Sequence, residues 1–171
     1  AFRKPLVVMT PKSLLRHKEC VSDIAMFAEG SSFHRVLYED VDLVAPEKIR
    51  RVVLCSGKVY YDLKKARDDR GIDDITIVRL EQLYPFPVRA LAEELEKYPD
   101  ADIVWCQEEP HNMGAWFFVD RKIEALLADL GHKARRPHYA GRPDAAAPAT
   151  GLLRRHSKEQ DKLVDAAPTL G

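Results

Sequence analysis

Two short polar stretches of the sequence combine residue types that could bind an anion or transfer a proton. The first, Ser56-Gly57-Lys58, follows an apolar run and precedes an amphipathic stretch. At the start of a helix, free backbone N–H groups, the helix dipole and a lysine ammonium can converge on a phosphate. A full phosphate loop needs a longer glycine-rich stretch before its Gly-Lys pair, and the sequence has none. We therefore favour a plain strand-to-helix turn with a solvated lysine.

The second stretch, Gln107-Glu108-Glu109-Pro110, ends an apolar run. In open α/β sheets, functional groups gather beyond the carboxyl ends of the strands, so the two carboxylates are candidates for a general acid or base. Carboxylates at such an edge also cap helices or face another subunit, and we favour that structural role. The following Asn112-Met113-Gly114 has the composition of a turn, whose asparagine we expect to cap a helix beginning near Ala115.

One arginine stands apart from the other basic residues. Arg142 lies in a turn beside Gly141, where the backbone can approach a ligand closely. The six histidines lack the spacing of metal ligands, no serine lies in a nucleophile elbow, and no cysteine has an obvious histidine partner nearby in sequence. We therefore expect no metal site and assign no catalytic residue to this chain.

Apolar, β-branched runs alternate with amphipathic stretches along the chain, which predicts βαβ units. The predicted strands are Leu6–Met9, Phe33–Tyr38, Arg51–Cys55, Ile75–Leu80, Asp102–Cys106 and Ala134–Tyr139. The predicted helices are Lys58–Asp69, Val88–Tyr98, Trp116–Leu130 and Lys158–Ala167. The expected fold is a three-layer α/β/α sandwich around a mostly parallel sheet.

Composition and charge narrow the class of protein. The 171 residues include 27 Lys and Arg against 27 Asp and Glu, so no net positive field recruits nucleic acid or an acidic membrane. Three cysteines, scattered in sequence, indicate reduced core residues and a reducing compartment. The chain has no apolar run long enough to span a bilayer and no signal peptide. It lacks an initiator methionine and enters a strand-like run at once, which indicates a fragment.

Five segments, in order, resemble the C-terminal region of the first component of 2-oxoglutarate dehydrogenase complexes, and the resemblance covers essentially all 171 residues. The segments are Lys4–Arg16, Ser56–Leu63, Arg79–Pro87, Gln107–Pro110 with Asn112–Trp116, and Tyr139–Pro143 with Pro148–Gly151. The resemblance implies a fold like the transketolase C-terminal domain. Residues 1–18 would be the last strand of a preceding pyrimidine-binding domain plus a linker, and residues 19–171 the C-terminal domain.

The resemblance also implies a parent enzyme with a defined activity. That enzyme uses thiamine diphosphate and Mg²⁺ to decarboxylate 2-oxoglutarate and passes the succinyl group to a lipoyl arm on the dihydrolipoamide succinyltransferase component. Its cofactor motif contains Gly-Asp-Gly, which this sequence lacks, so we expect this chain to bind no cofactor and to be inactive alone. The implied location is a bacterial cytoplasm, or the mitochondrial matrix if the source is eukaryotic.

The resemblance implies two roles for residues of this chain. By analogy with related dehydrogenase components, Glu108, Glu109, Gly114 and Trp116 would lie near the interface of a homodimer. Some members respond to nucleotide or acyl-coenzyme A effectors through this region, which makes Ser56, Lys58 and Arg142 candidates for an anion-binding cluster. Two alternatives remain, namely an autonomous nucleotide- or acyl-coenzyme A-binding module and a small independent enzyme that uses Glu108 and Glu109.

Overall fold

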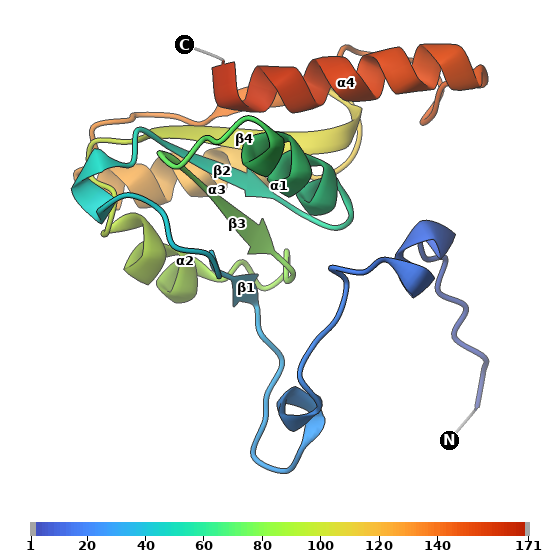
Figure 1. Cartoon of the computed structure of the whole chain (residues 1–171), viewed down its shortest axis with the longest axis horizontal. Coiled ribbons are helices and arrows are strands. Elements are labelled where there is room, and N and C mark those ends of the chain that lie inside the picture. Colours follow the sequence, from blue (N-terminus) through green and yellow to red (C-terminus); the bar gives the residue numbers. More distant parts are fainter. Residues whose placement is uncertain (1–2, 170–171) are drawn as a thin grey trace. The chain divides into compact units, whose positions relative to one another are not determined.

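The computed structural model describes residues 3–169 and divides the chain into two units, Ala1–Phe33 and His34–Gly171. The larger unit contains a five-stranded sheet and the α-helices of the fold (Figure 1). Its strands are β1 (Val36–Leu37), β2 (Arg51–Cys55), β3 (Ile75–Leu80), β4 (Asp102–Pro110) and β5 (His138–Arg142). Its helices are α1 (Val59–Asp69), α2 (Val88–Leu95), α3 (Trp116–Asp129) and α4 (Leu153–Thr169). None of the helices in the described part of the chain is long and apolar enough to cross a membrane.

The sheet has the strand order β1-β3-β2-β4-β5. β2 pairs in parallel with both β3 and β4, β4 pairs in parallel with β5, and only the short edge strand β1 runs antiparallel to its neighbour. The parallel part of the sheet begins at the central strand β2, continues with β3 on one side and then crosses to β4 on the other. The carboxyl ends of β2 and β4 therefore form the topological switch point at which open α/β sheets place functional groups.

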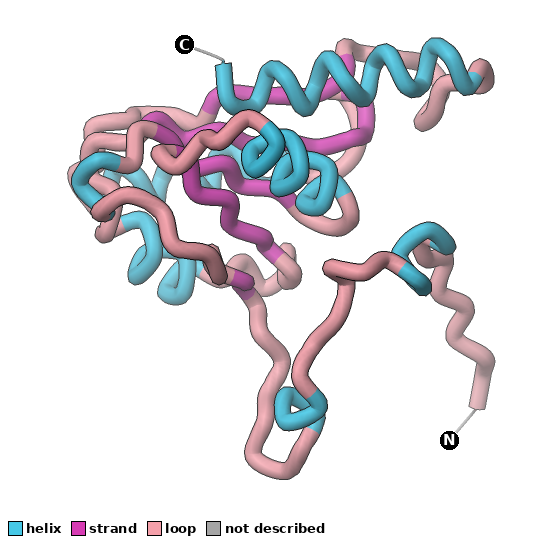
Figure 2. Tube along the Cα trace, viewed as in Figure 1, coloured by secondary structure: helices cyan, strands magenta, loops and turns pink. Residues whose placement is uncertain are grey.

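Helices cover both faces of the sheet (Figure 2). On one face, α2 and α3 pack on the even-numbered residues of β2, such as Val52 and Leu54, and form the main apolar core with Trp105. On the other face, α1 and α4 pack on the odd-numbered residues, such as Val53. Because β2, β3 and much of β4 are covered on both faces, these strands are mostly apolar and do not alternate strictly between apolar and polar residues. The predicted three-layer α/β/α fold is confirmed.

The predicted elements and the observed ones differ mainly at their ends. The central strands β2 and β3 coincide with the prediction, whereas β4 continues through Pro110, so Gln107–Pro110 lie within a strand instead of after it. The last helix begins at Leu153, earlier than predicted, and the last strand is displaced to His138–Arg142. In each case the sheet or the neighbouring helix supplies pairing and packing that local sequence does not reveal.

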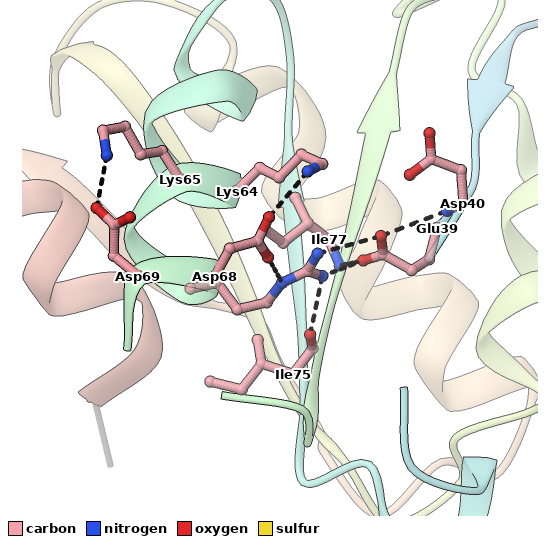
Figure 3. Close-up of polar contacts among 9 residues, drawn as sticks. Glu39, Asp40, Lys64, Lys65, Asp68, Asp69, Ile75 and Ile77 are labelled. Atoms are coloured by element: carbon pink, nitrogen blue, oxygen red, sulfur yellow. Dashed lines mark hydrogen bonds and ion pairs between the residues drawn. The ribbon is translucent and has the colours of Figure 1, made fainter. Parts of the chain in front are cut away.

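The prediction of a six-residue strand at Phe33–Tyr38 was wrong, because only Val36 and Leu37 pair with β3. Continuing the antiparallel register would place Glu39 opposite Ile77. There the Glu39 carboxylate, instead of its backbone, accepts the N–H of Ile77 at 3.2 Å, and it also binds Arg67 of α1 (Figure 3). A side chain thus replaces the backbone ladder at this edge of the sheet.

The smaller unit contains two short 3₁₀ turns, Lys12–Arg16 and Ile24–Phe27, among its described residues. The predicted strand at Leu6–Met9 is not formed within this chain, because no described segment pairs with it. The four side chains of this segment are 65% to 91% exposed. The described residues therefore provide this segment with neither strand pairing nor a surface that buries its apolar side chains.

Candidate functional site

A polar network joins the carboxyl ends of β2, β4 and β5. Lys58, which follows β2, forms an ion pair with the carboxylate of Glu108 on β4. Arg142, at the end of β5, donates from Nη1 to the carbonyl oxygen of Glu108 at 2.8 Å. Two of the three residues predicted for an anion-binding cluster therefore meet in space around Glu108, although they are far apart in sequence.

Helix α4 completes this network through Gln160. The Gln160 amide donates to Glu108 Oε1 at 3.0 Å and to Asp62 Oδ2 of α1 at 2.8 Å, while its oxygen accepts from Arg142 Nη2 at 2.9 Å. The Lys58 ammonium thus faces a carboxylate that also belongs to the internal network. Sequence inspection missed Gln160, since nothing in an amphipathic helix marks which polar residue returns to the sheet edge.

Ser56 lies apart from Lys58 and Arg142. It lines a separate hollow of about 540 Å³ on the other side of the strand ends, together with Gly57, Glu109 and Gly114. The rest of its wall is largely apolar and consists of Leu83, Tyr84, Trp105, Ala115 and Phe118, with the side chain of Gln107. Tyr84 at its rim is 80% exposed. The predicted trio of Ser56, Lys58 and Arg142 is therefore divided between two places.

Gln107 organises the turn between β4 and α3. Its Oε1 accepts the indole N–H of Trp105 and the backbone N–H of Trp116, each at 3.0 Å. Its Nε2 donates to the carbonyl oxygens of Pro110 at 3.2 Å and Met113 at 2.7 Å. A single buried amide thus accepts the first backbone N–H of α3 and closes the preceding loop, whereas the prediction gave the start of this helix to Asn112.

The prediction that Asn112 caps α3 was wrong. The Asn112 side chain instead exchanges two hydrogen bonds with the backbone of Ala145, at 3.0 and 3.1 Å. Beside it, His111 Nδ1 lies 3.0 Å from Asp144 Oδ1, and its ring packs edge-on against Tyr139. These contacts fasten the loop after β5 to the turn after β4.

The residues predicted for an interface have unequal access to solvent. Glu109 and Gly114 are exposed, whereas Trp116 is buried within the chain and Glu108 is largely covered by the polar network. Gly114 has a positive φ of 69°, and a Cβ there would lie 2.9 Å from Glu109 Cβ and 3.0 Å from Gln107 Nε2. Both the positive φ and the close packing therefore require glycine at position 114.

Neither buried cysteine has the properties of a nucleophile. Cys55 and Cys106 are register partners on adjacent strands and are fully buried. Burial raises the pKa of Cys106 to about 12 and raises the pKa of Cys55 well above its ordinary value. Within residues 3–169, no group of three or more His, Cys, Asp or Glu side chains is arranged to hold a metal ion.

Comparison with known proteins shows which family the sequence of the chain resembles. A family model described as 2-oxoglutarate dehydrogenase C-terminal matches residues 21–168. Proteins named 2-oxoglutarate dehydrogenase E1 component from Brucella ovis, Brucella canis and Brucella suis are each 56% identical to the chain over 163 residues. Each alignment covers 91% of this chain but 16% of the relative, so the chain spans about a sixth of the length of these curated relatives.

Proposed function

The chain belongs to the 2-oxoglutarate dehydrogenase C-terminal family, and from that premise we propose that it is the C-terminal domain of such a dehydrogenase E1 component. The family match over residues 21–168 is the observation that carries the proposal. The parent would decarboxylate 2-oxoglutarate and succinylate the lipoyl group of a dihydrolipoamide succinyltransferase. The Brucella relatives support a bacterial cytoplasm as its location.

In this proposal, thiamine diphosphate and Mg²⁺ act in the parent and are held by residues outside this chain. The sequence contains no Gly-Asp-Gly motif, which supports that assignment. The thiamine ring would supply the carbanion chemistry of decarboxylation. The role of the C-terminal domain is then to complete the assembly that holds the catalytic domains.

The proposed assembly contacts lie on two sets of exposed apolar residues. Residues 1–18 would contain the last strand of the preceding domain plus a linker, and the exposed, unpaired Leu6–Met9 supports this division. In the larger unit, Tyr84 and Phe117 are exposed, and Glu109 and Gly114 line the hollow beside Tyr84. We assign this surface to contacts with the rest of a homodimeric parent.

The experiment uses a parent truncated before residue 1 of this chain. Coexpression with the 171-residue chain should restore 2-oxoglutarate decarboxylation with thiamine diphosphate and Mg²⁺, whereas each piece alone should give none. The double variant Tyr84→Ser and Phe117→Ser should restore less, and Arg89→Gln, which lies at an exposed position of α2, should restore as much as the wild type. Decarboxylation by the purified chain alone would contradict the proposal.

An effector site is the second part of the proposal. Lys58 and Arg142 meet around Glu108, which supports an acyl-coenzyme A or nucleotide site there, with Ser56 on the far side of the strand ends. A thermal-shift titration of the chain with acetyl-coenzyme A and AMP tests it. A rise in the unfolding temperature that Lys58→Met abolishes supports the site, and no shift at millimolar ligand removes it. If a ligand raises the unfolding temperature of the chain but the chain does not restore decarboxylation to the truncated parent, an autonomous binding module is favoured.

A further inference from the structure

A second hollow, of about 450 Å³, lies beneath the loop that joins β5 to α4. Most of its wall is the backbone and small side chains of residues 143–151, and Arg142, Arg155 and Glu159 supply most of its charge. Gly151, which precedes α4, and Arg155, in the first turn of α4, also line it. The positive end of a helix dipole favours a negatively charged group at this position.

Three donors surround the carboxylate of Glu159 in the wall of this hollow. Thr150 Oγ1 donates to Oε2 at 2.6 Å, and Arg155 Nε donates to Oε1 at 2.7 Å. Arg142 Nε lies 3.5 Å from Oε2. The hydrogen bond from Thr150, followed by that from Arg155, lowers the pKa of Glu159. The carboxylate therefore remains ionised well below neutral pH and fills the point where these donors meet.

Arg142 is the buried cation in the wall of this hollow, whereas Arg155 is exposed. Its side chain is only 8% exposed, and its Nε is buried without a hydrogen bond to any described group, although Nη1 and Nη2 are both bonded. The nearest acidic oxygen to this Nε, Glu159 Oε2, lies 3.5 Å away, so the buried donor is ion-paired but not well hydrogen-bonded, which is costly. Two guanidinium groups also face one carboxylate here. The other acid of the wall, Asp144, is directed toward His111.

We propose that this hollow is a binding site for an oxyanion, the phosphate or carboxylate group of a small ligand, and that Glu159 occupies it as an internal competitor. Arg155 is 72% exposed, so it can turn from Glu159 to a ligand without disturbing the core. The entering oxyanion would take the donors of Thr150 and Arg155 and offer Arg142 Nε a closer acceptor than Glu159, which lies 3.5 Å away. The site goes beyond the function proposed above and shares only Arg142 with the effector proposal.

The test is isothermal titration of the 171-residue chain with inorganic phosphate, pyrophosphate and malonate at constant ionic strength. Glu159→Gln removes the competing charge and should tighten binding of at least one oxyanion by roughly tenfold, the scale of one charge-assisted hydrogen bond. Adding Arg155→Gln to Glu159→Gln should abolish that gain. Adding Arg121→Gln instead should leave the gain intact, because Arg121 is an exposed arginine of α3.

The outcomes separate the ligand classes and decide the proposal. Tighter binding of phosphate or pyrophosphate alone identifies a phosphorylated ligand, and tighter binding of malonate alone identifies a carboxylate. The proposal is overturned if Glu159→Gln binds none of the three more tightly than the wild type, or if the added Arg155→Gln changes nothing. Both positions are solvent-accessible, and circular dichroism confirms that the variants fold. No enzymatic activity is measured, so failure of the proposed function leaves this test valid.

Discussion

The carboxylate of Glu39 binds the guanidinium of Arg67 inside the protein, with side chains only 7% and 4% exposed (Figure 3). The same pair hydrogen-bonds two backbone groups of β3, because Glu39 accepts the N–H of Ile77 and Arg67 donates to the carbonyl oxygen of Ile75 at 3.3 Å. Burial acts to lower the pKa of Arg67, but the hydrogen bond and charge of Glu39 outweigh it and raise that pKa. The pair thereby fixes the segment before β2 to α1 and the sheet.

We expect Glu39→Gln to destabilise the chain by about 3 kcal/mol, because it removes the buried counter-charge of Arg67 and leaves only the more exposed Asp68 as its acidic partner. Urea unfolding followed by circular dichroism measures the loss. Lys65→Gln is the matched control on the same helix, since it breaks the exposed pair with Asp69 and should cost less than about 1 kcal/mol. Equal losses for the two variants would show that burial of the Glu39–Arg67 pair has no energetic consequence.

Gly114→Ala should destabilise the chain more than Gly131→Ala. Both glycines have a positive φ, 69° and 62°, so both substitutions cost about 1 kcal/mol in backbone conformation. Only at Gly114 would the new methyl group also meet Glu109 and Gln107, whereas nothing lies within 4 Å at Gly131. We expect a further loss on the order of 1–3 kcal/mol at Gly114. Indistinguishable unfolding free energies would rule out the close packing.

Gln107→Met should lower stability by about 2–4 kcal/mol, since it leaves the N–H groups of Trp105 and Trp116 and the carbonyl group of Met113 without this partner. Those are the two tryptophans of the sequence, so the change should also alter the intrinsic fluorescence spectrum. Gln82→Met is the control, because Gln82 donates to Pro85 at an exposed site. An unchanged spectrum and stability in Gln107→Met would contradict the organising role of this amide.

Iodoacetamide at mildly alkaline pH should modify only Cys20 of the folded chain. Cys20 is exposed, whereas Cys55 and Cys106 are buried and their pKa values are raised, that of Cys106 to about 12. Intact mass spectrometry should detect a single adduct under native conditions and three in denaturant. The Cys20→Ser variant should then acquire none while folded, and rapid labelling of either remaining cysteine would refute the assignment.

The contacts of Glu159 with Thr150, Arg155 and Arg142 should make the stability of the chain change with pH in the acid range. The folded-state pKa of Glu159 is lowered from its ordinary value of 4.5, mainly by Thr150 and then Arg155. Its contribution is therefore complete above about pH 4.5 and is lost as pH falls through the lower folded value. The difference in thermal midpoint between wild type and Glu159→Gln should shrink as pH falls below the ordinary pKa of 4.5 into the acid range. A difference that is constant across this range would contradict the shift.

Much of the fold could be predicted from local pattern. The strands Arg51–Cys55 and Ile75–Leu80 coincide with β2 and β3, because central strands of a parallel sheet are buried on both faces and read as continuous apolar runs. The edges were predicted less well. Phe33–Tyr38 has the composition of a longer strand, but Glu39 replaces the backbone pairing that would extend it.

The candidate sites were predicted less completely. Lys58 and Arg142 were recognised as cations near strand ends, but their common neighbour Glu108 was assigned to an interface, and Gln160 and Glu159 were not singled out. Polar residues on an amphipathic helix have no local mark that distinguishes a solvated side chain from one that returns to the sheet. That distinction depends on where α4 crosses β4 and β5.

The sequence by itself determined the alternation of strands and helices, the layer architecture and the family resemblance, because these follow from the short-range periodicity and ordered motifs of one chain. Only the tertiary structure decided that Gln107 rather than Asn112 accepts the first N–H of α3, that Glu39 pairs with Arg67, and that Ser56 lies apart from Lys58 and Arg142. Each of these depends on strand register and helix placement. Those bring residues together across long sequence separations, where local propensity carries no information.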